Sequence, residues 1–262
     1  MTSMHDQPQP LGDLLRTMPL PVSLKRHAPL SLGRRMYSVR LGDTALAAGL
    51  GATFDDTCLL TVAEDMDPDQ VPLKLSVQGP KKRFTGLHLT ALSTKGQCNL
   101  LLGDDHLKVF IGTECNIRAG FHLFRQSSVF IGDRTTIGQS RLQVSNADLV
   151  IGEDCQIIED CVLQCNDPHP FIDLSNGELI NGERRRMYLG RHVLVHRRCL
   201  LMPGVRICDG AIIQAGALVT HDVQPNTLVG GSPAVTLREQ VGWERDFAKT
   251  ANRPRAKPAD LS

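Results

Sequence analysis

The segment LGRHVL-VHRRCL-LMPGVR-ICDGAI-IQAGAL-VT, residues 189–220, decides the fold. An aliphatic residue begins every group of six, an interval too long for one face of a helix and too regular for a β-sandwich. A fixed internal period indicates stacked, repeated units rather than one ordinary globular core. The repeat positions are Leu189, Val195, Leu201, Ile207, Ile213 and Val219.

The same interval occurs earlier in the chain, inside longer units. The strings VFIG, VFIG and LVIG place Ile111, Ile131 and Ile151 twenty residues apart, each followed by glycine, and the interval of six returns at Ile117 and Ile157. Each unit therefore has three short sides, and the chain winds round a triangular prism that rises about 4.8 Å per turn. We expect the aliphatic side chains to stack inside it, and the glycines to occupy corners with positive φ.

The cysteines follow the same register. None of the eight forms a C-x-x-C pair, and Cys115, Cys155, Cys161 and Cys199 each lie four residues after a repeat position. Other coils carry mainly small apolar residues there, so we interpret most thiols as packing groups rather than zinc ligands or disulfides. Reduced cysteines without a secretory signal favour a cytoplasmic location.

Composition sets loose bounds. The 262 residues have a net charge of +1 and 4% aromatic residues. This charge gives no nucleic-acid signature, and so few rings suit a narrow aliphatic prism better than a base-stacking platform. No stretch approaches the length of a membrane span. We expect one repeat domain and a smaller partner.

Residues outside the repeats are harder to assign. Residues 1–33 are proline-rich and are interpreted as an extended arm, with a short helix over about Leu11 to Met18. Residues 34–102 contain the alternating runs LKLSV and LHLTAL, which predict strands. These strands make either a small β-rich domain or irregular first coils that cap the prism.

The remaining boundaries follow the repeat. The β-helix is predicted to occupy residues 103–234, with an inserted loop at residues 167–186 that interrupts an otherwise regular coil. Residues 235–262 are predicted to form a short helix, from about Val235 to Lys249, followed by a disordered tail.

Two segments carry a resemblance. Residues 199–239, CLLMPGVRICDGAIIQAGALVTHDVQPNTLVGGSPAVTLRE, resemble the last coils of the hexapeptide-repeat acyltransferases, which are left-handed parallel β-helices. Residues 167–181, DPHPFIDLSNGELIN, resemble the catalytic loop of the sugar O-acetyltransferases, including those acting on surface polysaccharides. The resemblance covers about residues 109–243 and implies an all-β fold, an acetyl-CoA-dependent enzyme and a homotrimer with active sites between neighbouring prisms.

The resemblance implies that His169 is the general base and that Asp167 orients its ring. A sugar hydroxyl is a poor nucleophile until its proton is removed, and a neutral imidazole, with a reference pKa of about 6.5, accepts that proton near pH 7. The alternative is a loop histidine without a chemical role. His169 lies in a loop that leaves a rigid scaffold, and functional side chains tend to lie in such loops, which favours the catalytic interpretation.

The resemblance also implies where acetyl-CoA binds. Its pantetheine arm would lie along the later coils, where small residues permit a close approach to the backbone, and Arg238 would meet a phosphate. Alternatively, Gly and Pro only turn the chain. No metal is expected. The remaining cofactor-binding candidates are Gly204, Ala215, Gly216, Ser232, Pro233 and Ala234.

Three residues are candidates for binding the saccharide acceptor: Asn181, Arg185 and His196. Arg185 lies in a run of three arginines at 184–186, and His196 opens a second basic run at 196–198. If these runs lie on the groove they favour an anionic acceptor, such as a uronic- or sialic-acid glycan or a nucleotide sugar. Otherwise they are solvated faces.

Departures from the family pattern keep other hypotheses open. Gln214, Ala217, His196 and His221 stand where relatives commonly carry glycine, serine, glycine and lysine, which motivates a β-helix that has lost catalysis and serves as a binding or assembly subunit. A zinc enzyme similar to the β-helical carbonic anhydrases would instead use three imidazoles, from residues 169, 192 and 196. We favour direct acetyl transfer to a saccharide hydroxyl.

Overall fold

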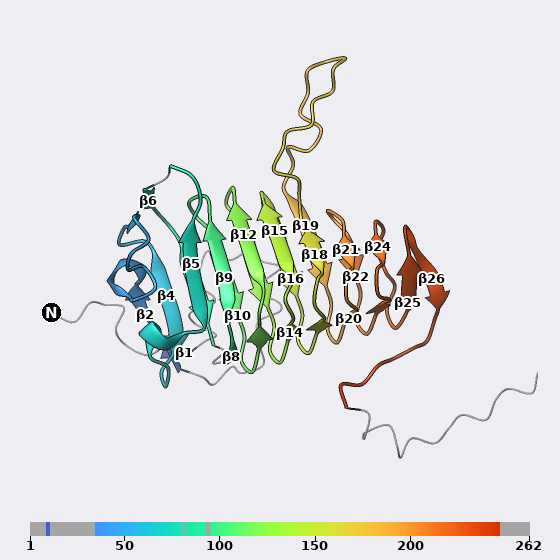
Figure 1. The fold of residues 1–262 in the computed structure, drawn as a ribbon, viewed down its shortest axis with the longest axis horizontal. Helices are drawn as coiled ribbons and strands as arrows, with labels where there is room; N and C mark the ends of the chain where they lie inside the picture. Colours follow the sequence, from blue (N-terminus) through green and yellow to red (C-terminus); the bar gives the residue numbers. More distant parts are fainter. Residues whose placement is uncertain (1–8, 11–34, 81, 93–94, 247–262) are drawn as a thin grey trace, which may run out of the picture.

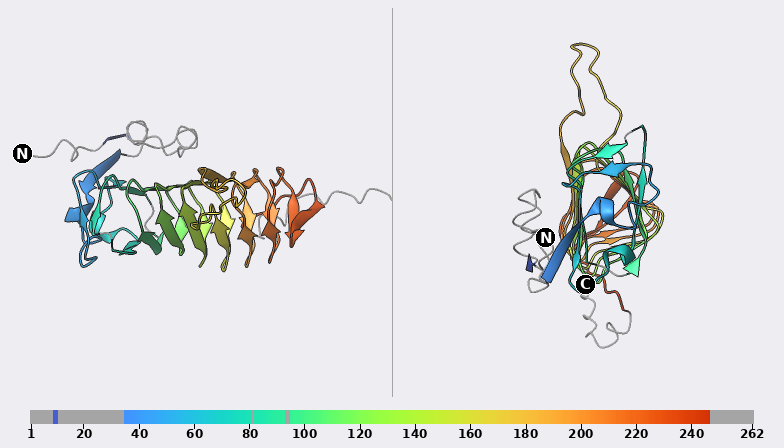
Figure 2. Two further views of the ribbon diagram at one scale, coloured as in Figure 1. Left: turned by 90° about the horizontal axis from the view of Figure 1, so that it is seen from above. Right: turned by 90° about the vertical axis from the view of Figure 1, so that its left-hand side faces the viewer.

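The computed structural model describes residues 9–10, 35–80, 82–92 and 95–246. Three sheets, parallel except at their ends, form the sides of a prism (Figure 1), and the buried residues are mainly aliphatic. The view along the prism axis in Figure 2 shows the coils superimposed and a single loop projecting from one edge. The fold is a left-handed parallel β-helix; the repeat predicted its stacked coils, and the resemblance predicted its left-handed sense.

The first side is a nine-stranded sheet, in the order β1 (Gln9–Pro10), β2 (Arg35–Arg40), β4 (Leu59–Ala63), β7 (His88–Ala91), β10 (Lys108–Ile111), β13 (Ser128–Ile131), β16 (Ala147–Ile151), β19 (Arg185–Leu189) and β22 (Arg206–Ile207). The second side has eight strands, in the order β8 (Lys95–Gly96), β11 (Asn116–Ile117), β14 (Thr136–Ile137), β17 (Gln156–Ile157), β20 (Leu194–Val195), β23 (Ile212–Ile213), β25 (Leu228–Gly231) and β26 (Ala234–Arg238).

The third side has seven strands, in the order β5 (Leu73–Val77), β9 (Cys98–Leu102), β12 (Gly120–Phe124), β15 (Arg141–Ser145), β18 (Val162–Gln164), β21 (Leu200–Leu201) and β24 (Leu218–Val219). A two-stranded sheet pairs β3 (Thr53–Phe54) with β6 (Arg83–Phe84), and two short 3₁₀ helices are η1 (Leu41–Asp43) and η2 (Pro68–Gln70). We call the turn from first to second side the first corner, from second to third side the second corner, and from third to first side the third corner.

The repeat positions form the predicted interior ladders. On the first side, parallel pairing aligns Ile111, Ile131, Ile151, Leu189 and Ile207 in successive coils, and all five are buried. Stacked aliphatic side chains remove apolar surface from water at every turn, which contributes roughly 25 cal/mol for each Å² buried. The interval of six therefore reflects one large aliphatic residue in the ladder of each side, with a second buried residue four positions later at the corner.

The glycines after Ile111, Ile131 and Ile151 have a different role from the expected one. None has a positive φ; the left-handed position lies two residues later, for example at Arg134 (φ 58). A Cβ on Gly132 would lie 2.6 Å from the backbone nitrogen of Glu153 in the next coil. The prediction of positive φ is therefore wrong, and these corners need glycine because successive coils approach each other closely.

The cysteines pack as predicted. All eight are free, and Cys115, Cys155, Cys161 and Cys199 are buried at the corners, where each thiol donates to a backbone carbonyl of another coil. Burial raises the pKa of the Cys115 and Cys155 thiols to about 12. These two side chains therefore stay protonated and behave as small apolar groups.

Residues 35–102 build the first coils of the same prism. Strands β4, β7 and β10 pair in parallel on the first side, and β5 pairs in parallel with β9 on the third. At this end, β2 runs antiparallel to β4 and β1 antiparallel to β2. This antiparallel pairing covers an edge that would otherwise expose unpaired backbone groups. The helix predicted over about Leu11 to Met18 lies outside the described residues.

The other end differs from prediction. Instead of a helix from Val235, the chain forms β26, which pairs antiparallel with β25 and covers the last open edge. Residues 239–246 contain no helix either, so the helix prediction is wrong over the described part of this segment. The backbone groups of the last coil need partners, and this demand outweighs helix propensity. The predicted tail, residues 247–262, lies outside the described residues.

No helix within the described part of the chain is long and apolar enough to cross a membrane.

Candidate active site

The longest interruption of the coils is a loop at the third corner. We call residues 165–184, between β18 and β19, the third-corner loop; it stands well clear of the prism (Figures 1 and 2). In the next coil the same corner needs only four residues, 202–205. The loop is thus an insertion on a rigid scaffold, where functional side chains tend to lie.

Two arginines anchor the base of the loop. Arg184 donates to the buried Asp148 on β16 (Nη2 to Oδ1, 2.6 Å) and to the carbonyl of Gln126 (2.9 Å). Arg186 reaches the other Asp148 oxygen at 3.5 Å. A buried carboxylate needs such partners. Arg184 and Arg186 are therefore occupied in holding the loop to the first side.

Asp167 and His169 form a hydrogen-bonded pair at the start of the loop. Asp167 Oδ1 accepts from the backbone N–H of His169 and lies 2.9 Å from His169 Nδ1. The Asp167 carboxylate is partly covered, whereas the imidazole side chain is 82% exposed. The backbone N–H of His169, and then its ring, hold the pKa of the Asp167 carboxyl below its usual value.

This geometry selects one tautomer of the ring. An ionised carboxylate can only accept, so Nδ1 carries the proton that lies between His169 and Asp167. Nε2 of the neutral ring then carries the lone pair and faces away from Asp167. The pair has the arrangement in which a carboxylate orients an imidazole base.

Asn181 fixes the backbone on either side of the imidazole. Its amide nitrogen donates to the carbonyl of His169 (2.7 Å), and its amide oxygen accepts from the backbone N–H of Phe171 (2.9 Å). The side chain predicted to bind the acceptor is thus engaged within the loop, at a position directly beside the base.

Arg125 is a contributor that the sequence did not reveal. From the third corner of an earlier coil, its Nη2 donates to the carbonyl of Pro168 (3.1 Å), one residue before His169. Asn166 was also missed; it accepts from the backbone N–H of Asp167 (2.9 Å). Neither residue stands in a motif, and their partners are set by the stacking of coils, which leaves no local sequence signal.

The candidate cofactor residues occupy more than one corner. Gly204 lies at the third corner, on the same edge as the third-corner loop. Ala215 and Gly216 lie at the second corner, where Ser232 and Pro233 also form the turn from β25 into β26, which begins at Ala234. Gly204 and Gly216 have φ values of +84° and +74°, and a Cβ at either would meet only open space. Both glycines therefore present bare backbone at the surface.

The structure does not bring all the candidates together within one protomer. Ala215, Gly216 and His196 lie on the second corner, so the third side stands between them and the loop. A side of six extended residues is at most about 20 Å wide. Arg238 pairs with Leu228 at the far end of β26, toward the first corner and away from Ala234. His169 and Gly204 share one edge, whereas most of the remaining candidates line another.

The basic runs are largely paired. Arg197 lies 3.2 Å from Glu159 and Arg198 lies 4.0 Å from Asp160, both in the preceding coil. Arg185 and His196, by contrast, are exposed. These two side chains are the parts of the basic runs best placed to meet a ligand.

The three histidines considered for zinc lie on three different corners: His169 on the third, His192 on the first and His196 on the second.

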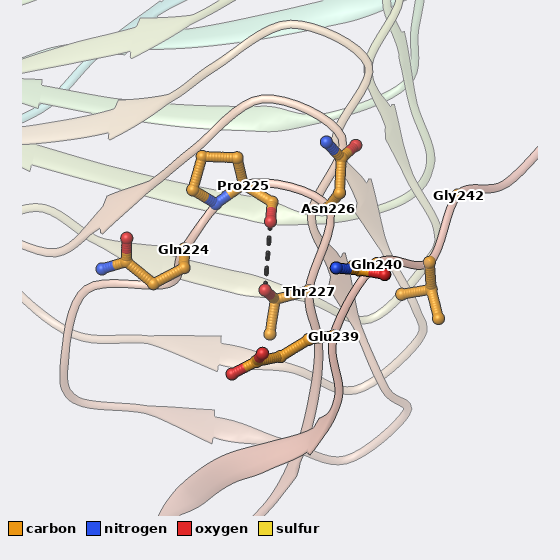
Figure 3. A pocket seen from close by; sticks show the side chains of 8 residues that line it. Gln224, Pro225, Asn226, Thr227, Glu239, Gln240 and Gly242 are labelled. Atoms are coloured by element: carbon orange, nitrogen blue, oxygen red, sulfur yellow. Dashed lines mark hydrogen bonds between the residues drawn. The ribbon is translucent and has the colours of Figure 1, made fainter.

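A separate cavity of about 610 Å³ lies at the first corner, between residues 224–227 and 239–242 (Figure 3). Gln224, Asn226, Glu239 and Gln240 extend around it, and Thr227 donates to the carbonyl of Pro225 (3.1 Å). None of the predicted site residues lines this cavity. The cavity therefore lies on a different edge of the prism from Asp167 and His169.

Comparison with known proteins gives sequence relatives and a related structure. Polysialic acid O-acetyltransferase from Escherichia coli O1:K1 / APEC is 31% identical over 120 residues, which are 45% of this chain and 39% of that protein. Chloramphenicol acetyltransferase from Agrobacterium fabrum is 40% identical over 70 residues, 27% of this chain and 32% of the relative. The chain thus spans well under half the length of both relatives. No protein-family model matches it.

Among solved structures, the polySia-specific acetyltransferase NeuO aligns with a TM-score of 0.59 at 26% identity, covering 68% of this chain and 82% of that one. In fold, the chain therefore resembles the left-handed β-helix, hexapeptide-repeat acyltransferases. Within that class, the chain resembles the polysialic acid O-acetyltransferases in both sequence and structure.

Proposed function

We propose that this protein is an O-acetyltransferase that moves the acetyl group of acetyl-CoA to a hydroxyl of a saccharide. The observation that carries the proposal is the Asp167–His169 pair, held at 2.9 Å on a loop that projects from the prism. Similarity to polysialic acid O-acetyltransferase supports the reaction and the class of acceptor.

In this reaction His169 Nε2 removes the proton from the acceptor hydroxyl as its oxygen attacks the thioester carbon. The C–O bond forms, the tetrahedral intermediate collapses, and the C–S bond breaks to release coenzyme A as its thiol after proton return from the ring. A positioned base of this kind contributes roughly 10²- to 10⁴-fold to the rate. Asp167 holds the ring and stabilises the imidazolium that forms in between.

The acyl donor belongs, in this proposal, in a groove between two protomers. His169 and Gly204 lie on the third corner, whereas Ala215, Gly216 and the segment 232–234 lie on the second. A second copy whose second corner meets the third corner of the first would complete the site. For a prism of triangular section, this head-to-tail contact closes after three copies, which gives a homotrimer with the third sides inward.

The exposed apolar residues of the loop support such a contact. Large apolar side chains rarely cluster in solvent unless they meet a partner. The loop carries Phe171, Ile172, Leu174, Leu179 and Ile180, each about half exposed or more. A neighbouring prism would cover part of this surface.

For the acceptor, we propose that the exposed Arg185 and His196 favour a saccharide with an anionic group. Similarity to chloramphenicol acetyltransferase favours a second acceptor class, a hydroxyl on a small non-sugar molecule. The free, buried cysteines favour a reducing compartment, for which we propose the cytoplasm. The proposed chemistry needs no metal.

The test is thiol release from acetyl-CoA with neutral and acidic saccharides, nucleotide sugars and chloramphenicol as acceptors. Wild type is compared with His169→Ala and with Asn176→Ala, a substitution at the exposed loop tip. Saccharide-stimulated release that is lost only in His169→Ala supports the proposal. Stimulation by chloramphenicol alone would favour the second acceptor class, and acetyl-CoA binding without release by any acceptor would favour a non-catalytic scaffold.

A further inference from the structure

A C-terminal strap crosses the first corner of the prism, away from the loop. We call residues 241–246 the strap; Figure 1 shows the chain leaving β26 and turning back toward the middle of the molecule. The strap begins where the Val241 N–H donates to the carbonyl of Asn226 (2.9 Å). It ends where Arg245 donates to the carbonyls of Arg134 (3.0 Å) and Cys155 (2.7 Å). Four coil steps, about 19 Å, separate Asn226 from Arg134.

His192 and Trp243 are the centre of this contact. Their rings stack with centroids 4.2 Å apart and planes 8° from parallel. The indole N–H of Trp243 donates to the carbonyl of His192 (2.7 Å). Arg245 Nε donates to Asp154 Oδ1 at 2.7 Å, so the strap is tied to the prism on both sides of the stack.

Both nitrogens of the His192 ring face acceptors. Nδ1 lies 2.7 Å from Asp154 Oδ2, and Nε2 lies 3.0 Å from the backbone carbonyl of Trp243. A carbonyl cannot donate, and neither can an ionised carboxylate. A neutral imidazole has one N–H, so it would turn a lone pair toward one of these oxygens; only the imidazolium donates to both.

Other charged groups at this corner are consistent with an ionised Asp154. Although burial raises the pKa of its carboxyl, the hydrogen bonds from Arg245 and His192 outweigh burial and lower it. Arg245 adds a positive charge that opposes protonation of the ring. The charges within two flanking ion pairs largely cancel each other. These pairs are Arg134 with Glu153 at 2.8 Å and Arg191 with Asp209 at 3.0 Å.

The coil itself does not require histidine at this place. His192 has a φ of 55°, and the equivalent corner positions of earlier coils are Glu114 (φ 55), Arg134 (φ 58) and Asp154 (φ 57). Several polar residues therefore fit the turn. What distinguishes His192 is the pair of acceptors that the strap and the preceding coil place at its ring.

We propose that the strap is a proton-dependent latch: it docks on the first corner when His192 is doubly protonated and is released when the ring loses a proton. The docked state holds one more proton than the released state, so docking is favoured at low pH and lost as pH rises. The docking constant therefore falls as pH rises through the range in which imidazole groups titrate, by up to about tenfold per pH unit. In strong acid, protonation of Asp154, whose pKa is lowered here, removes one of the acceptors of Arg245 and weakens docking again.

Trp243 is the only tryptophan of the chain, so its fluorescence reports directly on the strap. Acrylamide quenching of the full-length protein is measured between about pH 5 and pH 8.5, a range that spans imidazole titration. We expect quenching to rise with pH in wild type and in the control His221→Gln, an exposed histidine on the third corner. His192→Gln removes the titrating ring and should make quenching independent of pH.

A second measurement separates docking from direct quenching by the ring. In ¹⁵N spectra of labelled protein near pH 6, both His192 ring nitrogens should be protonated while Trp243 is protected. A neutral ring beneath a protected Trp243 would overturn the latch, as would wild-type quenching that stays flat with pH or a transition that persists in His192→Gln. None of these readouts depends on acetyltransferase activity.

Discussion

At the scale of single residues, the chemistry of the Asp167–His169 pair depends on two hydrogen bonds that one carboxylate oxygen accepts. The backbone N–H and the ring of His169 both meet Asp167 Oδ1. These bonds keep the pKa of the Asp167 carboxyl below its usual value. The carboxylate is therefore charged throughout the pH range in which imidazole groups titrate, so protonation of Asp167 should not limit activity within that range.

Asp167→Asn tests the role of this carboxylate. Rotated to face the ring, the amide N–H₂ would donate to Nδ1 and move the ring proton to Nε2, the atom that must accept from the acceptor hydroxyl. We expect kcat to fall by roughly 10²-fold or more, with KM for acetyl-CoA little changed. Steady-state kinetics check this, with Asp173→Asn at the loop tip as control; an unchanged kcat would remove Asp167 from the mechanism.

Arg184 offers a residue-scale test of stability. It is the nearest cation to the buried Asp148, at 2.6 Å, with Arg186 at 3.5 Å as a weaker partner. Arg184→Ala leaves a buried carboxylate poorly compensated, and such losses cost about 3–5 kcal/mol when no second partner remains. We expect a clear fall in Tm. The double variant Asp148→Asn/Arg184→Ala should recover part of it, and equal Tm values for single and double variants would contradict the argument.

At the scale of elements, glycine has two separate roles in the coils. Gly132 is needed because the backbone of the next coil lies 2.6 Å from where its Cβ would stand, whereas Gly120 has nothing within 4 Å. Gly132→Ala should therefore lower the free energy of unfolding by roughly 1–3 kcal/mol, the range for overpacking a tight interior. Gly120→Ala, at the start of β12 on the third side, should be close to neutral. Chemical denaturation of both variants checks the difference.

The third-corner loop is held both by side chains and by backbone pairing of its two arms, in which the N–H of Ile180 donates to the carbonyl of Phe171 (2.7 Å). Asn181 joins its two arms with bonds of 2.7 and 2.9 Å around the base. Asn181→Ala should leave Tm nearly unchanged, because the prism does not depend on the loop, but lower kcat by misplacing the imidazole. Asn176→Ala at the tip is the matched control. A large Tm loss with intact kcat would mean that Asn181 only stabilises.

At the scale of the whole molecule, the proposed site needs two copies. His169→Ala removes the base from the third corner, and Gly216→Trp fills the second corner of the groove. Each variant alone should be inactive, whereas coexpression of the two should restore about a quarter of wild-type activity, since random assembly leaves one contact in four with both corners intact. Light scattering should report three copies. No restoration in mixed trimers would place the whole site within one protomer.

The sequence by itself determined the prism. A strict period of six puts one aliphatic side chain inward on each side, and only stacked coils bury them all. It also determined the corner cysteines, because their register matches that of small apolar residues, and the position of the inserted loop. These features depend on local spacing, which a single sequence displays.

Only the tertiary structure decided the rest, because the partners come from coils far apart in the chain. Arg125 meets Pro168 across 43 residues, and Arg245 meets Arg134 across 111. The stacking of coils is also the reason that the corner glycines are needed where two backbones approach closely. It explains why β26 forms in place of the predicted helix, and why the cofactor-binding candidates lie on two edges of the prism. Stacking converts separation along the sequence into contact in space, and no local pattern records which coil will lie beside which side chain.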